Sequence, residues 1–441
     1  MNHKLSCRII MGWMIAGLLG LGAQDGAAFC RYLPESNTIW VHDYPTSMPC
    51  TPALLLRTDR MFEWGLVEYA PESDTYTINA NLRLGYNDGA DTFFQIGSRE
   101  HPRETLVLKG NLVLYPEFFR GQDHHRRGIN RLTIGVKDDP SVRAALKFHN
   151  EPGQYHTLLS GTYYEGADRP SKNGPYGGQL HVYHSLITAA IQDRSHAIGA
   201  AGNRHFYIPG AYGYVALRQA TISWVAGVIA FGMTAKYSDV ADSIFEHSGY
   251  ALINSDQAAV NCIFRNLRTA IMDWGGPLDA LLTNCRFEDN DANWSLSRGR
   301  LRCVDCVFGA PKKGNIYKSW PEQQAGTKPY AYFESSRHVM VRVQDRQGGP
   351  IAGARIEVTT ALNPLERKIV FTGNDGQTPG PGVEGALLLI ERRETATAVE
   401  NSPEIIDFTY DLAVTASNRQ DAIVHNLAPT QSWMMVTVAL D

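Results

Sequence analysis

The sequence predicts an all-β protein: a right-handed parallel β-helix followed by a small β-sandwich. Three observations lead to this fold class. One six-residue pattern recurs four times, a second apolar segment follows each copy at a constant distance, and a different alternating pattern begins near residue 338. The chain also holds 40 Gly and 20 Tyr among 441 residues and few long helical patterns, which favours β-structure.

The recurring pattern reads VADSIF, AVNCIF, LTNCRF and CVDCVF, beginning at residues 240, 259, 282 and 303. Side chains alternate across a strand, so the small fourth residue and the Phe at position six share one face, which suits a core. We expect an internal column of small side chains, because a thiol packs as a small hydrophobe. Its members are Ser243, Cys262, Cys285 and Cys306. Cys303 is expected to face the other way, and the oxidation states of the four cysteines stay open.

The third position of the pattern is always Asp or Asn, and alternation predicts that it points outward along one sheet face. Two interpretations stay open for this column: hydrogen bonding and solvation between coils, or binding of a glycan. The column contains Asp242, Asn261, Asn284 and Asp305.

The distance from the bulky sixth position to the next apolar segment is seven residues in each copy, including a degenerate copy at 218–223. The bulky positions are Ile222, Phe245, Phe264 and Phe287, and the segments are reached at Ile229, Leu252, Ile271 and Trp294. The spacing between copies varies (23, 19, 23 and 21 residues). One constant and one variable connection are typical of a coil that stacks on its neighbours about 4.8 Å apart.

Two resemblances follow from these residues. Residues 218–310 resemble the β-helix repeats of the pectate-lyase-like superfamily, which implies the fold but no particular activity. Residues 338–441 resemble the carboxypeptidase-regulatory-like or transthyretin-like β-sandwich, through Val341, Val343 and Asp345, the run Gly348–Ala354 and the turn at Asp375–Gly376. In that family these residues build the fold and carry no catalysis.

The predicted organisation has four parts. Residues 1–28 are expected to be a secretory signal peptide, since Lys4 and Arg8 precede an apolar run and small residues; an uncleaved N-terminal anchor is the alternative. Residues 29–310 form the β-helix, 311–337 a linker and 338–441 the sandwich. We therefore expect a secreted, periplasmic or cell-surface protein that is not an integral membrane protein. An exported chain makes a Cys30–Cys50 disulfide plausible, worth about 3 kcal/mol for its loop.

Candidate chemistry is scattered rather than assembled in a motif. The catalytic candidates are Asp242, Asp273, Arg298 and Arg300, and Trp274 is a candidate sugar-stacking ring beside Asp273. Glu288, Asp289 and Asp291, with Glu246, form a candidate Ca²⁺ site, because Ca²⁺ prefers oxygen ligands. For each of these, a solvated or structural side chain is the competing interpretation. No cofactor is required by any motif.

Three functions stay open. The first is an exported protein that binds a polysaccharide or envelope polymer without catalysis. The second is a polysaccharide lyase or glycoside hydrolase acting on an acidic glycan. The third is a structural component of an envelope assembly, with the sandwich docking to a protein partner. A formal charge of −4 gives no indication of nucleic-acid binding.

Overall fold

The computed structural model describes most of the chain from residue 29 onward and is nearly all β, with 57% strand and 4% helix, which confirms the predicted fold class. The predicted signal peptide, residues 1–28, lies outside the described residues. The described residues are 29–42, 44–45, 47–58, 60–85, 91–114, 130–149, 158–160, 178–193, 214–225, 228–229, 238–253, 258–273, 279–297, 299–309, 314–316, 331–360, 362–396, 403–431 and 433–441.

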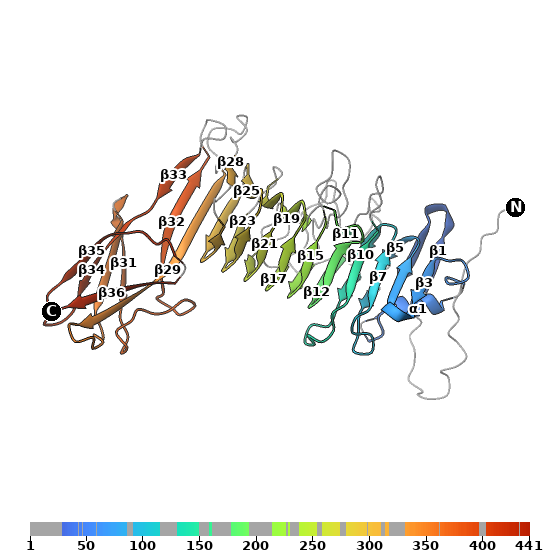
Figure 1. The fold of residues 1–441 in the computed structure, drawn as a ribbon, viewed down its shortest axis with the longest axis horizontal. Coiled ribbons are helices and arrows are strands. Elements are labelled where there is room, and N and C mark those ends of the chain that lie inside the picture. The colour runs from blue at the N-terminus through green and yellow to red at the C-terminus, as the bar shows by residue number, and fades with distance from the viewer. Residues whose placement is uncertain are drawn as a thin grey trace, which may run out of the picture. The chain divides into compact units, whose positions relative to one another are not determined.

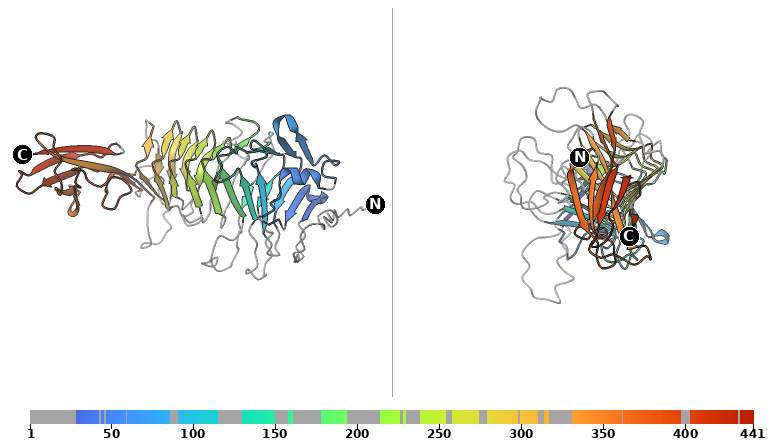
Figure 2. Two further views of the ribbon diagram at one scale, coloured as in Figure 1. Left: turned by 90° about the horizontal axis from the view of Figure 1, so that it is seen from below. Right: turned by 90° about the vertical axis from the view of Figure 1, so that its left-hand side faces the viewer.

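The chain divides into two compact units. Unit 1 comprises residues 1–258, 262–272 and 288–293, and unit 2 comprises 259–261, 273–287 and 294–441. Each unit contains stacks of parallel strands, drawn side by side in Figure 1 and as successive rungs in the left panel of Figure 2. None of the described helices is long and apolar enough to cross a membrane.

Unit 1 is built mainly from parallel stacks, to which we give the names sheets I to IV. Sheet I is β3 (Val67–Ala70), β4 (Thr75–Ile78), β7 (Thr105–Leu108), β10 (Ala145–Phe148), β13 (Leu186–Ala189), β15 (Thr221–Ser223), β18 (Ile244–Glu246) and β21 (Ile263–Arg265). Sheet II is β6 (Thr92–Ile96), β9 (Asn130–Ile134), β12 (Gly178–Tyr183), β14 (Tyr214–Arg218) and β17 (Ser238–Ala241).

Sheets III and IV complete unit 1. Sheet III is β1 (Phe29–Leu33), β2 (Thr38–His42), β5 (Asn81–Leu84), β8 (Leu112–Leu114) and β11 (Leu158–Ser160). Sheet IV is β16 (Val228–Ile229), β19 (Tyr250–Ile253) and β22 (Thr269–Met272). The pairs β1–β2 and β3–β4 are antiparallel. Short helices lie nearby in sequence: η1 (Pro34–Ser36), α1 (Pro52–Arg57) and η2 (Pro71–Ser73).

The register places like residues over like residues, as the repeat predicts. Phe245 in β18 pairs with Ile222 in β15 on one side and with Phe264 in β21 on the other, and the two Phe rings stack at 5.3 Å. Ser243, Cys262, Cys285 and Cys306 are all buried, which confirms the internal column. The predicted seven-residue spacing is one residue too long for the degenerate copy, because Val228, not Ile229, aligns with Leu252.

The Asp and Asn column lies at the corners of the coil, which corrects the expectation that it lines a sheet face. Each of these residues follows a strand and has a positive φ near 50°, as do His184 and Gln219 earlier in the chain. Asn and Asp adopt this left-handed conformation more readily than most residues. At the equivalent position of another coil stands Gly135, where a Cβ would come within 2.1 Å of the Tyr183 carbonyl oxygen. The column therefore reflects backbone conformation at the corner.

The corner also corrects the expected direction of Cys303. Cys303 and Cys306 are both buried inside the coil, because the left-handed residue Asp305 between them interrupts the strand alternation. A second left-handed corner follows the strands of sheet I, at Trp224, His247 and Asn266, and Asp289 has the same conformation after β24 (Arg286–Glu288).

Unit 2 combines the last coil strands with a C-terminal two-sheet domain. The coil strands are β20 (Ala258–Val260), β23 (Asp279–Thr283), β24 (Arg286–Glu288), β25 (Ala292–Leu296), β26 (Arg300–Val304), β27 (Val307–Phe308) and β28 (Gly314–Ile316). Strand β29 (Tyr332–Asp345) begins inside the range predicted as linker. It pairs in parallel with β26 through Tyr332–Ser336 and with β36 (Met434–Leu440) through Val339–Asp345.

The C-terminal two-sheet domain, residues 338–441, closes around one apolar core. One sheet holds β29, β36, β32 (Leu387–Thr395) and β33 (Glu404–Asp407), and the other has the order β31 (Asn363–Phe371), β30 (Arg355–Thr360), β34 (Tyr410–Thr415) and β35 (Ala422–Leu427). Val341 and Val343 from the first sheet and Ile356 and Leu412 from the second share that core.

Candidate functional site

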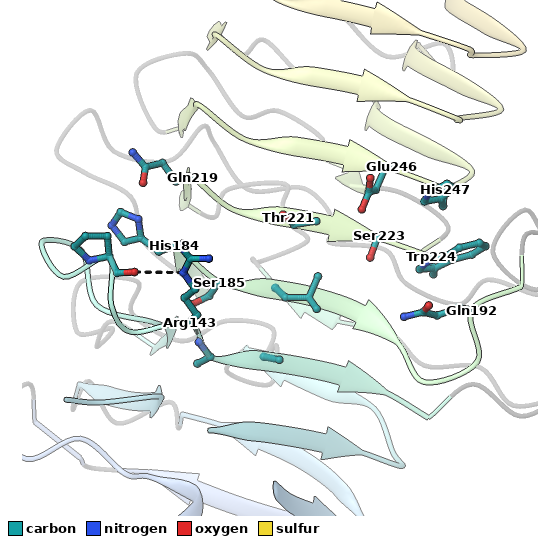
Figure 3. A pocket seen from close by; sticks show the side chains of 14 residues that line it. Arg143, His184, Ser185, Gln192, Gln219, Thr221, Ser223, Trp224, Glu246 and His247 are labelled. Atoms are coloured by element: carbon teal, nitrogen blue, oxygen red, sulfur yellow. Dashed lines mark hydrogen bonds between the residues drawn. The ribbon is translucent and has the colours of Figure 1, made fainter. Parts of the chain in front are cut away.

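A groove of about 790 Å³ lies in unit 1 on the outer side of sheet I, across β10, β13, β15 and β18 (Figure 3). Clefts of this size are the usual places for small-molecule ligands to bind. The two left-handed corners bound the groove. Its floor comes from the outward-facing positions of the strands between them.

The side chains of the floor are uncharged. Ala145, Leu186 and Thr221 pair in register across three neighbouring strands, so their side chains form one row. Ser223 lies in the next row, and its hydroxyl donates at 3.0 Å to the hydroxyl oxygen of Thr188, which is fully buried and does not line the groove. Small and hydroxyl-bearing side chains leave room for a ligand and offer hydrogen bonds to it.

His184, Gln219 and Arg143 stand at the end of the groove nearer the first corner (Figure 3). His184 Nε2 is 3.2 Å from the Lys137 carbonyl oxygen, and Arg143 Nε donates to the Pro140 carbonyl oxygen at 3.5 Å. His184 and Gln219 have φ of 52° and 51°. This end therefore presents a guanidinium, an imidazole and an amide, all capable of binding oxygen atoms of a ligand.

The end nearer the second corner is aromatic. The rings of Trp224 and His247 stack with centroids 4.6 Å apart and planes 9° apart. Both residues are left-handed, with φ of 56° and 51°. Bulky residues rarely adopt this conformation, and such strain tends to gather at functional sites. The neighbouring Glu246 receives a hydrogen bond from Arg265 Nε at 2.7 Å.

Buried hydroxyl groups hold both corners in place. Ser185 Oγ accepts from Ala144 N, and Ser248 Oγ accepts from Val225 N, each at 3.1 Å. Ser248 Oγ also donates to the Glu246 carbonyl oxygen at 2.9 Å. These bonds tie successive coils together beneath the groove, so its shape is set before a ligand arrives.

The predicted binding column lies elsewhere. Asp242, Asn261 and Asn284 are exposed at their corners, and Asn284 Nδ2 donates to Asn261 Oδ1 at 2.8 Å. Asp305 is instead 3% exposed and accepts a 2.8 Å hydrogen bond from His338 N. Its Oδ2 also lies 2.5 Å from His338 Nδ1, within hydrogen-bond distance. Hydrogen bonding between coils thus accounts for the Asn pair, and hydrogen bonds to His338 account for Asp305.

Both carboxylate oxygens of Asp273 accept hydrogen bonds from a neighbouring loop. Asp273 is 4% exposed, and its Oδ2 accepts from Ser297 N at 2.9 Å and from Gly299 N at 2.6 Å, while its Oδ1 accepts from the Ser297 hydroxyl. Arg300 is exposed in β26. The other two candidates of this region, Trp274 and Arg298, lie outside the described residues.

The candidate calcium ligands do not gather. Among the residues that the structure describes, no three His, Cys, Asp or Glu side chains converge in a way that could hold a metal ion. Asp289 occupies a left-handed corner with φ 51°, Asp291 is exposed and Glu288 is half-buried in β24. Glu246 is bound to Arg265.

The predicted disulfide between Cys30 and Cys50 is not formed in the structure. Both side chains are buried. Burial, followed by the charge of nearby Cys30, raises the pKa of the Cys50 thiol well above its ordinary value. A raised pKa keeps a thiol protonated at neutral pH. Oxidation in an exported protein stays a prediction.

The groove itself was not predicted from the sequence. Its signal was present, because Trp224 and His247 each stand two residues after the bulky column at Ile222 and Phe245. Reading that column as a second corner would have placed both rings at one edge of sheet I.

Comparisons with protein-family models, with curated proteins and with solved structures found no match to this chain. The two family resemblances therefore depend on the sequence patterns alone.

Proposed function

We propose that this chain is an exported β-helix protein that binds a polysaccharide or other envelope polymer in the groove on sheet I. The observation that carries the proposal is the stacked, conformationally strained pair Trp224 and His247 beside a hydroxyl-bearing floor. A pyranose ring has an apolar C–H face that packs on an aromatic ring, and hydroxyl groups that need polar partners around it.

Several features favour binding over glycoside hydrolysis. Hydrolysis by inversion or retention needs two carboxyl groups flanking the scissile bond. Glu246 is the one carboxylate among the described residues that line the groove, and Arg265 engages it. A lyase needs a base and a group that neutralises the uronate carboxylate. His184 and Arg143 have the right chemistry at the first corner, so lyase activity on an acidic glycan is the second candidate function.

The same proposal includes the finer identities. We assign the coil region to the pectate-lyase-like superfamily and the C-terminal two-sheet domain to the carboxypeptidase-regulatory-like or transthyretin-like sandwiches. The sequence pattern at Val341, Val343 and Asp345 supports the second assignment. A role in an envelope assembly, with this domain docking to a protein partner, is the third candidate.

The test is binding of the purified protein to a panel of immobilised acidic and neutral polysaccharides, with solution titration of any that retain it. Trp224→Asn and His247→Asn remove the rings while keeping a residue that accepts the left-handed conformation. Trp64→Ala is the matched control, because Trp64 is also in unit 1 and is 38% exposed, away from the groove.

The proposal expects one class of polymer to be retained, with binding weakened about tenfold or more in both corner variants and unchanged in Trp64→Ala, as for loss of a stacking ring. New unsaturated ends during incubation, lost with His184→Ala, would establish the lyase instead. Equal retention of all variants, or no retention of any polymer, contradicts the proposal.

A further inference from the structure

A second cavity, of about 360 Å³, lies within the C-terminal two-sheet domain and is independent of the groove. Its walls come from both sheets: Val358 and Tyr410 on one side, Ile390 and Ile406 on the other, with Phe408 beside them. Most of these side chains are hydrocarbon. A cavity of this kind and size suits a small apolar ligand or an alkyl chain.

The cavity wall is fixed by hydrogen bonds. The Tyr410 hydroxyl accepts from Ile390 N at 3.0 Å and donates to the Ile390 carbonyl oxygen at 3.1 Å, which links β34 to β32. Arg393 lies over the Phe408 ring at 5.4 Å and binds Glu334 at 2.9 Å. The charge of Arg393 is therefore balanced by Glu334.

Lys368 is the unbalanced charge at this cavity. It pairs in register with Val358, a buried core residue, so Lys368 lies on the core-facing side of β31, the edge strand of its sheet, and its side chain is exposed at that edge. Its ammonium donates to the Leu388 carbonyl oxygen at 2.6 Å. In the described part of the chain no carboxylate lies within ion-pair distance of it. An ammonium carries three donors, so Lys368 retains two for a ligand.

We propose that this cavity binds a single-chain amphiphile with an anionic head, the alkyl chain entering between the two sheets and the head binding Lys368. A carboxylate and a phosphate head share this chemistry. Burial of the alkyl chain against apolar walls is favourable, and a positive group at the rim favours a negative head over a neutral one.

Inward charge on an edge strand has another known use, which is to prevent pairing with a second chain. That role predicts self-association when Lys368 loses its charge, and it predicts no affinity for an amphiphile. Exposed Ile369 and Phe371 on the same strand would instead suit a protein segment. The cavity favours a ligand of alkyl shape, because those two side chains are not among its lining residues.

The experiment is isothermal titration of the full chain with decanoate, decyl phosphate and 1-decanol, each below its aggregation concentration. Lys368→Met removes the charge and keeps the length of the side chain. Arg367→Met is its matched control, a cation on the same strand that binds Glu357 on the other face. Ile406→Trp fills the cavity. Unfolding midpoints and size-exclusion profiles show that each variant is folded and unassociated.

The proposal expects one site that binds decanoate or decyl phosphate about tenfold more tightly than 1-decanol, the usual effect of one hydrogen bond to a charged group. Lys368→Met abolishes that difference, Arg367→Met preserves it, and Ile406→Trp loses all three ligands. Equal affinity for the three ligands, no binding of any, or unchanged binding to Ile406→Trp overturns it. If Ile406→Trp does not fold, Lys368→Met decides alone.

Discussion

The left-handed corner at Asn284 predicts that Gly is more stable than Ala at this position, the reverse of the usual order. Its φ is 52°, its side chain is exposed, and its amide donates to Asn261 Oδ1 at 2.8 Å. An ordinary L-residue in this conformation loses about 1–2 kcal/mol relative to right-handed backbone, a cost that Gly avoids. An exposed amide hydrogen bond contributes about 0.5 kcal/mol more. Asn284→Ala should therefore lower the free energy of unfolding by about 1.5–2.5 kcal/mol.

Asn284→Gly loses the hydrogen bond but not the conformation. Gly has greater freedom in the unfolded chain, and that cost is smaller than the strain placed on Ala at positive φ, so we expect Gly to be more stable than Ala by about 1 kcal/mol. The assay is the midpoint of urea unfolding for both variants. A comparison of midpoints does not require unfolding of this repeat protein to be two-state.

Thr283 supplies the control, because it precedes Asn284 in the extended conformation of β23. There Gly should be the less stable variant by about 0.5–1 kcal/mol. Opposite orders of Gly and Ala at the two neighbouring positions support the corner explanation. The same order at both positions refutes it, and with it the view that the Asp and Asn column is selected by backbone conformation.

Three further predictions concern buried groups of the two units. Burial raises the pKa of Glu104 to about 6, the nearby charge of Asp74 adds to this, and a hydrogen bond from Gly97 N partly opposes it. The protonated Glu104 carboxyl therefore contributes about 2 kcal/mol to the free energy of unfolding, relative to the ionised form. This contribution is complete below the ordinary pKa of 4.5 and is lost as the pH rises through about 6. The melting temperature of Glu104→Gln should rise relative to that of the wild type between pH 4 and pH 8. Melting temperatures of the two proteins that change in parallel with pH would rule this out. Asp273→Ala should destabilise by about 3 kcal/mol, since it leaves the backbone donors of Ser297 and Gly299 without their acceptor; Asp273→Asn, which keeps one acceptor oxygen, should cost less, and an unchanged melting temperature in Asp273→Ala would show the bonds to be unimportant. For Cys30 and Cys50, intact mass of the exported protein should show the loss of two hydrogens, reversed by reductant, whereas two alkylatable thiols in the native secreted sample would exclude the disulfide.

The repeat made the coil predictable because every second residue of a strand faces the core and must therefore be small or apolar. Ser243 and Phe245 both lie in the core as expected. The corners were the limit of that reasoning. One left-handed residue interrupts the alternation, which is why Cys303 and Cys306 both face inward and why Asp242 lies at a turn.

The candidate site was harder to foresee than the fold. Its floor at Ala145 and Thr221 comes from segments far apart in sequence that only the register brings together. Its rings stand at corners, where the sequence gives an aromatic residue in place of the usual Asn or Asp. Asp273 shows the reverse error, since an acid beside a Trp suggested chemistry but its oxygens are occupied by the loop at Ser297 and Gly299.

The most direct test of the account is hydrogen–deuterium exchange of the full chain with and without a saturating polysaccharide from the binding panel. Binding in the groove on sheet I predicts slower exchange in peptides covering 184–193, 219–225 and 244–249, with residues 338–441 unchanged. Protection confined to other segments, or absent from all three of these, would contradict the groove as the binding site.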